Sequence, residues 1–286
     1  MPVVQRVPTN LTRNLVSRVL AAGAVILGLL STGCETPEER DLSRGLAHEK
    51  VKDFKAALTD FHHAILRNPQ SSAALIAAKE GAKVALLEIK DFKEAVEFFQ
   101  LIVIYSNDVS ERITAQKQLA AVYFDQLTDY PRAIEELNKL LATNLEQVDR
   151  VKYKTRLAKA YFYTNNFIQA ESEVNAFLKN EKGSDEDSLF QMMLLKGNIY
   201  LTKKEQNKAI EAFRELLKVY PERSVKENAA MTLAVAYEEM KDYKNAISVL
   251  EQMKQYHATP EYIDLRIKKL LADQKNQPGA KGVHHK

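Results

Sequence analysis

Hydrophobic and polar positions recur along this chain with a period of 37 to 39 residues. The clearest unit is an acidic or amide residue, an aromatic residue, two variable positions and an alanine, as in Asp53-Phe54-Lys55-Ala56-Ala57. The shared alanines are Ala57, Ala95, Ala133, Ala170, Ala209 and Ala246, and the residues four positions later are Phe61, Phe99, Leu137, Val174, Phe213 and Leu250. Because residues i and i+4 share one face of a helix, the pattern predicts a helix with one buried face in every copy.

A second pattern precedes each alanine and predicts a partner helix. Twelve positions before the alanine, five of the six copies have a small residue, namely Gly45, Ala121, Ala158, Gly197 and Ala234. The second copy has Lys83 there, and we expect a one-residue insertion near Phe124 in the third. The Asp or Asn between the two helices is placed to cap the second helix.

These features resemble the tetratricopeptide repeat, with its Gly/Ala-x-x-Tyr and Ala-x-x-x-Phe positions and a terminal proline at Pro69 and Pro221. The resemblance covers roughly residues 38–258. It implies an all-α fold, a right-handed superhelical solenoid of about six helix-turn-helix repeats over residues 41–275. Residues 261–275 are expected to form a C-terminal capping helix, and residues 276–286 a disordered tail.

The start of the chain has the composition of an export signal. Arg6, Arg13 and Arg18 precede any acidic residue, an apolar core covers residues 19–30, and Leu30-Ser31-Thr32-Gly33-Cys34 follows. This run resembles a bacterial lipobox. The resemblance implies that residues 1–33 are a lipoprotein signal peptide, that Cys34 is lipidated, and that residues 34–40 are the anchor and a short linker. The alternative is an ordinary secretory signal with a cysteine near its end.

Charge and motifs narrow the function classes. All three excess positive charges lie in the first 33 residues, so 38 basic residues face 38 acidic ones in the rest of the chain, which disfavours nucleic-acid binding. We find no glycine-rich phosphate loop and no serine elbow motif. The single cysteine and the six scattered histidines predict no metal site. We therefore expect no cofactor, no small-molecule substrate and no enzymatic activity.

The predicted interaction site is the groove formed by the first helix of each repeat. Carrying the family's groove positions onto this sequence, with a neighbouring basic cluster, gives Leu42, Leu46, Val84, Leu87, Val122, Lys152, Arg156, Lys159, Phe162 and Asn198. Such a surface suits a partner helix or an extended peptide with a hydrophobic stretch and an acidic end. The alternative is that these are packing residues and solvated charges.

Together these features predict a membrane-anchored scaffold that binds protein partners in the bacterial cell envelope. The expected place is the outer membrane, facing the periplasm, where such a protein could support assembly of an outer-membrane complex. A self-assembling structural protein is the second hypothesis, and an enzyme is the third. An uncapped terminal repeat would favour self-assembly, and the predicted helix at residues 261–275 argues against it.

Overall fold

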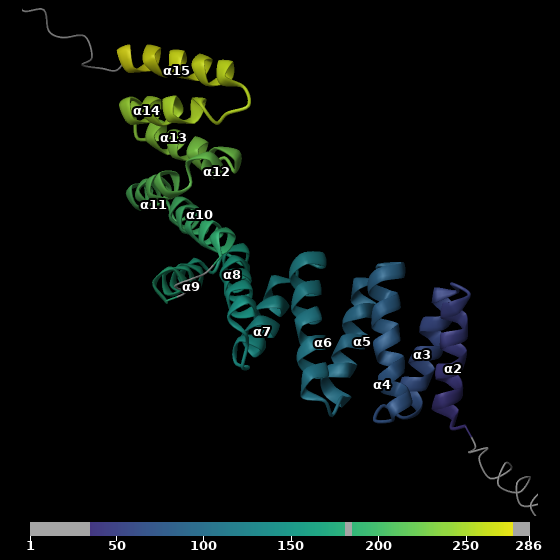
Figure 1. Ribbon diagram of the computed structural model, residues 1–286. Coiled ribbons are helices and arrows are strands. Elements are labelled where there is room, and N and C mark those ends of the chain that lie inside the picture. The colour runs from purple at the N-terminus through teal and green to yellow at the C-terminus, as the bar shows by residue number, and fades with distance from the viewer. Residues whose placement is uncertain (1–34, 181–184, 277–286) are drawn as a thin grey trace, which may run out of the picture. The chain divides into compact units, whose positions relative to one another are not determined.

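The computed structural model describes residues 35–180 and 185–276, and every regular element in these ranges is a helix (Figure 1). The predicted signal peptide, Cys34 and the tail after Asn276 lie outside the described residues. In order, the helices are α2 (Pro37–Lys50), α3 (Phe54–Arg67), α4 (Ser72–Lys83) continued by the π-helix η1 (Val84–Ile89), α5 (Phe92–Tyr105), α6 (Val109–Ala121) continued by the π-helix η2 (Val122–Gln126), α7 (Tyr130–Leu141), α8 (Gln147–Tyr163), α9 (Phe167–Asn180), α10 (Glu186–Thr202), α11 (Gln206–Val219), α12 (Pro221–Lys226), α13 (Ala229–Glu239), α14 (Tyr243–Lys254) and α15 (Pro260–Lys275). None of them is long and apolar enough to cross a membrane.

The helices form six consecutive pairs, which we number repeats 1 to 6, as the sequence predicts. The first helices are α2, α4–η1, α6–η2, α8, α10 and α12–α13, and the second helices are α3, α5, α7, α9, α11 and α14. After Arg112 the chain divides into two compact units. Unit 1 contains α2 to α5 and the start of α6, and unit 2 contains the rest.

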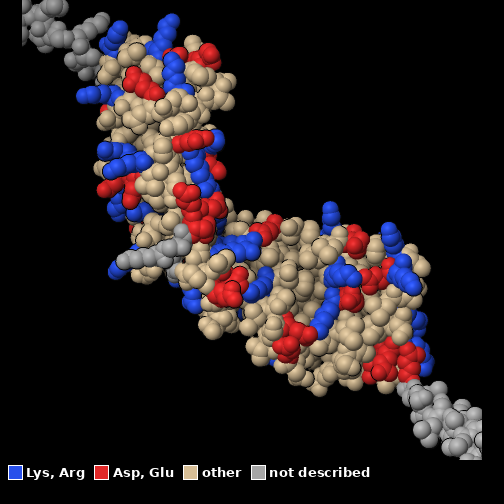
Figure 2. Space-filling model, in the orientation of Figure 1, with Lys and Arg blue, Asp and Glu red and all other residues tan. Residues whose placement is uncertain are grey.

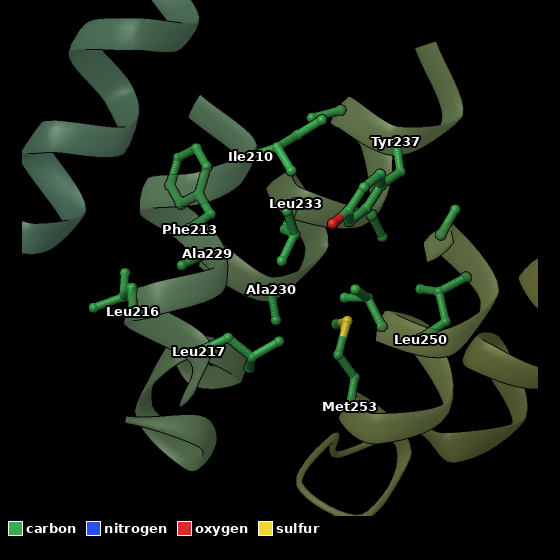
Figure 3. Close-up of a cluster of buried hydrophobic side chains, with 14 of the residues drawn as sticks. Ile210, Phe213, Leu216, Leu217, Ala229, Ala230, Leu233, Tyr237, Leu250 and Met253 are labelled. Carbon is green, nitrogen blue, oxygen red and sulfur yellow. The ribbon is translucent and has the colours of Figure 1, made fainter. Parts of the chain in front are cut away.

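The alanine of the repeat pattern is the centre of each pair. All six alanines are fully buried, and the six apolar residues four positions later are also buried. In repeats 5 and 6 these residues join one continuous core, which includes Leu216, Leu233 and Met253 (Figure 3). The i, i+4 pattern therefore identified the buried face of every second helix correctly.

The turn inside each repeat has the same construction in all six copies. The residue before the cap has a positive φ, as at Lys52, Lys90, Thr128, Asn165, Lys204 and Lys241. The next residue is the N-cap, one position before the second helix begins, and the N-caps Asp53, Asp91, Asp129 and Asp242 each accept a hydrogen bond from the backbone N–H three residues later. These are the caps that the sequence predicts.

Two π-helices account for the copies whose spacing is irregular. A π-helix accommodates one extra residue. In these repeats the buried small residue of the first helix therefore lies one position earlier in the chain than twelve before the alanine. In repeat 3, η2 contains Phe124, where we expect the insertion, and Ala120 is fully buried whereas Ala121 is only partly buried. In repeat 2, Ala82 is buried one position before the exposed Lys83, and the preceding Gly81 meets Phe98, the neighbour of the expected Phe99.

Both ends of the solenoid differ slightly from the predicted boundaries. The first helix begins at Pro37, four residues before the predicted start, because Thr36 and Glu39 form a capping box and Pro37 occupies a favoured first-turn position. At the other end, α15 packs on α14 through Ile263 and Leu270.

The first helix of repeat 6 is interrupted between α12 and α13, where Asn228 adopts a left-handed conformation, and the sequence pattern did not predict this break.

Candidate functional site

Ion pairs between neighbouring repeats occupy many of the charged side chains on the helix faces. In unit 1, Lys83 contacts Glu49 at 2.8 Å and Lys79 contacts Glu111. In unit 2 the pairs are Lys117–Asp149, Arg156–Asp125, Lys203–Glu171, Arg223–Asp187 and Arg266–Glu238, with N–O distances of 2.5 to 2.9 Å. Acidic and basic side chains consequently lie close together over the visible surface instead of separating into large patches (Figure 2).

In unit 1, the structure separates the predicted groove residues into two groups. Leu42 and Val84 are buried in the core, so they pack the helices and present no binding surface. Leu46 and Leu87 are exposed, by 40% and 61% of their surface. Val84 was misplaced because the π-helix that begins at this residue shifts the register by one position.

Val122 in unit 2 is buried for the same reason, at the first residue of η2. Ala121 precedes it and is partly exposed, in keeping with a one-residue shift. The hydrophobic part of the predicted groove is therefore smaller than the sequence suggests, and Leu46 and Leu87 are its exposed members.

The three basic residues of the cluster on α8 differ in their exposure and in their ion pairing. The Arg156 guanidinium contacts the Asp125 carboxylate at 2.6 Å and lies 5.5 Å from the centre of the Phe124 ring. Lys152 is exposed and Lys159 is partly buried, and neither forms an ion pair with any other described residue. The free positive charge of α8 thus lies at Lys152 and Lys159, while Arg156 links repeats 3 and 4.

Lys159 is the most unusual charged residue on this helix. Burial lowers the pKa of its ammonium group, and the charge of Arg156 acts in the same direction, while Asp187 and Glu227 partly oppose both effects. The two carboxylates are near enough to influence Lys159, but neither is within ion-pair distance. A half-buried cation without a direct counter-ion favours a ligand that brings a negative charge.

The first helices of repeats 5 and 6 carry several partly buried apolar side chains near the equivalents of Lys159 and Phe162. Asn198 corresponds to Lys159, and it is partly buried. Around it, Leu194, Leu201 and Met231 are partly buried and pack on the core of repeats 5 and 6. We call Lys152, Lys159, Phe162, Leu194, Asn198, Leu201 and Met231 the first-helix face of unit 2. The sequence reasoning missed the three apolar members. Leu201 stands at the register position of Phe162, and Leu194 and Met231 stand at that of Thr155, so reading these two positions across α10 and α13 would have found them.

A cavity of about 800 Å³ lies in unit 2 among α11, α13 and α14. Leu217, Leu233 and Val249 line it, together with Tyr237 and charged residues of α11. Leu233 is part of the core drawn in Figure 3. No motif in the sequence pointed to this cavity.

Two histidines on the first three helices have structural partners. His48 Nδ1 lies 2.8 Å from an Asp60 oxygen. His62 Nε2 lies 3.0 Å from a Glu94 oxygen, and its ring stacks on Phe98 with centroids 4.5 Å apart. Both therefore contribute to hydrogen bonding within unit 1, and His62 also contributes to packing.

Comparison with known proteins identifies the repeats. Residues 190–223 and residues 229–259 each match the tetratricopeptide repeat family. No curated protein sequence matches the chain. The chain thus contains tetratricopeptide repeats, as the sequence pattern predicts.

Solved structures resemble the fold of a large part of the chain. The crystal structure of MamA protein has 17% identity and a TM-score of 0.50, and the match covers 66% of this chain and 94% of MamA. The C-terminal part of a TPR repeat-containing protein from Cytophaga hutchinsonii has 16% identity and a TM-score of 0.52, and the match covers 87% of this chain and 92% of that one. At these identities the likeness establishes the solenoid fold.

Proposed function

We propose that this chain of tetratricopeptide repeats is a scaffold that binds protein partners and is held in the bacterial cell envelope by a lipid on Cys34. The observation that carries the binding part is the environment of Lys159. This lysine is half-buried on the first-helix face of unit 2 and has no ion-pair partner among the described residues, whereas Arg156 on the same helix is paired with Asp125.

The proposed partner is a helix or an extended peptide with an apolar stretch and an acidic end. A carboxylate of the partner would pair with Lys159 and Lys152, which removes the cost of leaving a half-buried cation unpaired. The apolar stretch would cover Leu194, Leu201 and Met231, which pack on the core and are still partly exposed. Asn198 offers hydrogen bonds to the partner's backbone between these two regions.

The short linker after Cys34 would keep the first repeat close to the membrane. Only Glu35 and Thr36 separate Cys34 from α2, so a lipidated Cys34 would be tethered by about 7 Å of chain. The first repeat would then lie against the membrane. Glu35 is not the aspartate associated with inner-membrane retention, and this favours the outer membrane, facing the periplasm.

Reversing the charge of Lys152 and Lys159 tests the proposed binding surface. We expect the Lys152→Glu/Lys159→Glu chain to lose at least tenfold in recovery of the main protein that crosslinks to the wild type in intact cells. Lys179→Glu, an exposed change on the second helix of the same repeat, is the matched control and should retain recovery. Arg156 is left unchanged because its reversal would break the link to Asp125. Equal recovery by the double variant and the control would contradict the proposed site.

Labelling with a fatty-acid analogue tests the anchor separately. The wild-type chain should become labelled in cells, and Cys34→Ala should not, because Cys34 is the only cysteine in the sequence and its thiol is the proposed attachment point. Equal labelling of both chains would refute the lipid anchor without affecting the binding surface.

The other two hypotheses make different predictions. A self-assembling protein would associate on its own in light scattering over a dilution series, whereas a scaffold stays monomeric until its partner is added. An enzyme would show a turnover that is lost when one residue of the first-helix face is changed. The solenoid fold and the Lys159 environment favour the scaffold.

A further inference from the structure

One edge of unit 1 carries large apolar side chains that are mostly exposed. Leu66 near the end of α3 is 77% exposed, Ile104 near the end of α5 is 67% exposed, and Val109 at the start of α6 is 58% exposed. Because the helices of each repeat are antiparallel, the ends of α3 and α5 and the starts of α2, α4 and α6 lie along one edge, the lower edge of unit 1 in Figure 1. We call Leu66, Ile104 and Val109 the apolar edge.

The repeat fold does not require two of these side chains. Leu66 and Ile104 stand nine positions after the alanine of their repeats. In repeats 3 to 6 this position holds Ala142, Lys179, Lys218 and Gln255. Those repeats form the same helix pair without a large apolar side chain there. A large apolar residue at this position is therefore specific to unit 1, and neither the repeat pattern nor the core accounts for it.

The links along the apolar edge are nearly uncharged. The link between α3 and α4 is Asn68-Pro69-Gln70-Ser71, and the link between α5 and α6 is Ser106-Asn107-Asp108, so Asp108 is their only charged residue. The turns at the opposite edge of unit 1, residues 50–53 and 88–91, each have three charged residues out of four. A surface that enters lipid loses its hydration, and the loss costs least for uncharged side chains.

The first helix of the chain begins at the same edge. Asn68 donates a hydrogen bond to the Glu38 carboxylate at 3.4 Å, so the end of α3 lies beside the first turn of α2. Only Glu35 and Thr36 stand between Cys34 and α2. A lipid on Cys34 would hold this edge at the bilayer, while the turn after α2 would lie about 21 Å farther out, because α2 has 14 residues.

The length of the tether distinguishes a lipid surface from a protein partner. Two extended residues span about 7 Å, whereas a helix with its side chains is about 10–12 Å thick. A helix of a partner protein therefore does not fit between the start of α2 and a bilayer that holds Cys34. The lipid itself is the surface that the apolar edge meets.

We infer that the apolar edge of unit 1 inserts into the headgroup region of a zwitterionic lipid bilayer. Leu66, Ile104 and Val109 would bury their exposed apolar surface there. The acidic Glu38 and Glu39 in the first turn of α2 disfavour a surface rich in anionic lipid. The inference rests on the proposed lipid at Cys34 for its orientation, and it adds which edge of the fold enters the membrane.

Quenching of tryptophan fluorescence by brominated lipid tests the insertion. The chain has no tryptophan and one cysteine, so an introduced tryptophan reports one position and Cys34 can be coupled selectively to a maleimide lipid. The purified full-length chain is coupled to phosphatidylcholine vesicles with brominated acyl chains. Leu66→Trp and Ile104→Trp should each lose at least twofold in emission relative to unbrominated vesicles. Val51→Trp, which is 72% exposed at the opposite edge of unit 1, is the matched control and should keep its emission.

A second set of variants separates insertion from mere proximity to the bilayer. Val109→Trp reports from the same edge and should also be quenched. Adding Leu66→Asp/Ile104→Asp should abolish this quenching, because charged side chains oppose entry into lipid. Val51→Asp/Leu87→Asp makes the same chemical change at exposed positions towards the opposite edge, and it should leave the quenching of Val109→Trp intact.

The outcomes distinguish this inference from the proposed function. It is overturned if Leu66→Trp and Ile104→Trp are not quenched, if Val51→Trp is quenched equally, or if Leu66→Asp/Ile104→Asp leaves the quenching of Val109→Trp unchanged. Stronger quenching on vesicles that also contain brominated phosphatidylglycerol would show attraction by basic side chains and would overturn it too. The maleimide lipid holds Cys34 at the bilayer whether or not cells lipidate it. Quenching without fatty-acid labelling in cells would thus refute the proposed anchor alone, and labelling without quenching would refute the apolar edge alone.

Discussion

At the scale of single residues, three glycines set how closely the two helices of a repeat approach. A β-carbon added at Gly45, Gly81 or Gly197 would lie 2.5 to 2.6 Å from a phenylalanine ring of the partner helix. The phenylalanines are buried and cannot move away without displacing other core residues. The glycine is therefore required by contact and not by backbone conformation.

Gly45→Ala is expected to destabilise repeat 1. Alanine has the better helix propensity by about 1 kcal/mol, but overpacking against Phe61 costs roughly 1–3 kcal/mol. We expect a net loss of about 1 kcal/mol, measured as a lower urea midpoint by circular dichroism. Phe61→Leu in the Gly45→Ala background should recover part of the loss relative to the two single variants. A higher midpoint for Gly45→Ala would show that propensity dominates and that the ring adapts.

At the scale of the element, a buried ionic network joins α2 to α3. Arg44 contacts both Asp41 and Asp60, with nitrogen–oxygen distances of 2.7 and 2.8 Å, and Arg67 also pairs with Asp41. Both carboxylates are almost entirely buried. Burial alone would raise the pKa of Asp41, but the hydrogen bond from Arg67 and the positive charges of Arg67, Arg44 and His63 together lower it.

The lowered pKa of Asp41 makes the stability of repeat 1 depend on pH. A carboxylate whose pKa is lower in the folded state stabilises that state above its unfolded pKa of about 3.9, and the contribution is lost as the pH falls towards the folded value. We expect protection of α2 and α3 amides from hydrogen exchange to decrease on acidification from pH 5 to pH 3. Asp41→Asn should be less protected at pH 5 and change less over this range. Identical pH profiles for the two chains would contradict the assignment.

At the scale of the molecule, the C-terminal end of unit 2 is closed by α15. Ile263 and Leu270 are fully buried in the same core as Leu250 and Met253. The outer side of α15 carries several charged residues, although Tyr262 and Leu265 are exposed there. The helix covers the face of α14 that a further repeat would occupy.

A chain truncated after Thr259 should expose that face and associate. Contiguous apolar surface on the last repeat would be left uncovered, and terminal caps of repeat proteins keep such surfaces from aggregating. We expect light scattering to show oligomers that the intact chain does not form, and a lower thermal midpoint. A chain ending at Asn276, which retains α15, is the control. A monomeric, equally stable truncated chain would show that α15 is dispensable.

The sequence alone determined the helix pairs, because helical periodicity and turn chemistry are local. The alanines at the centre of each pair, the apolar residue four positions later and the Asp caps follow from spacings of a few residues, and the structure confirms them. Even the insertion near Phe124 was visible as an irregular spacing.

Only the tertiary structure decided which side chains remain available for binding. Arg156 is engaged by Asp125, 31 positions earlier, and the extra residue in each π-helix places Val84 and Val122 in the core. Ring contacts also join Phe124 to Phe167 through Tyr130, Tyr163 and Phe162, which come from η2, α7, α8 and α9. These outcomes depend on distances between residues far apart in the chain, which a local pattern does not contain.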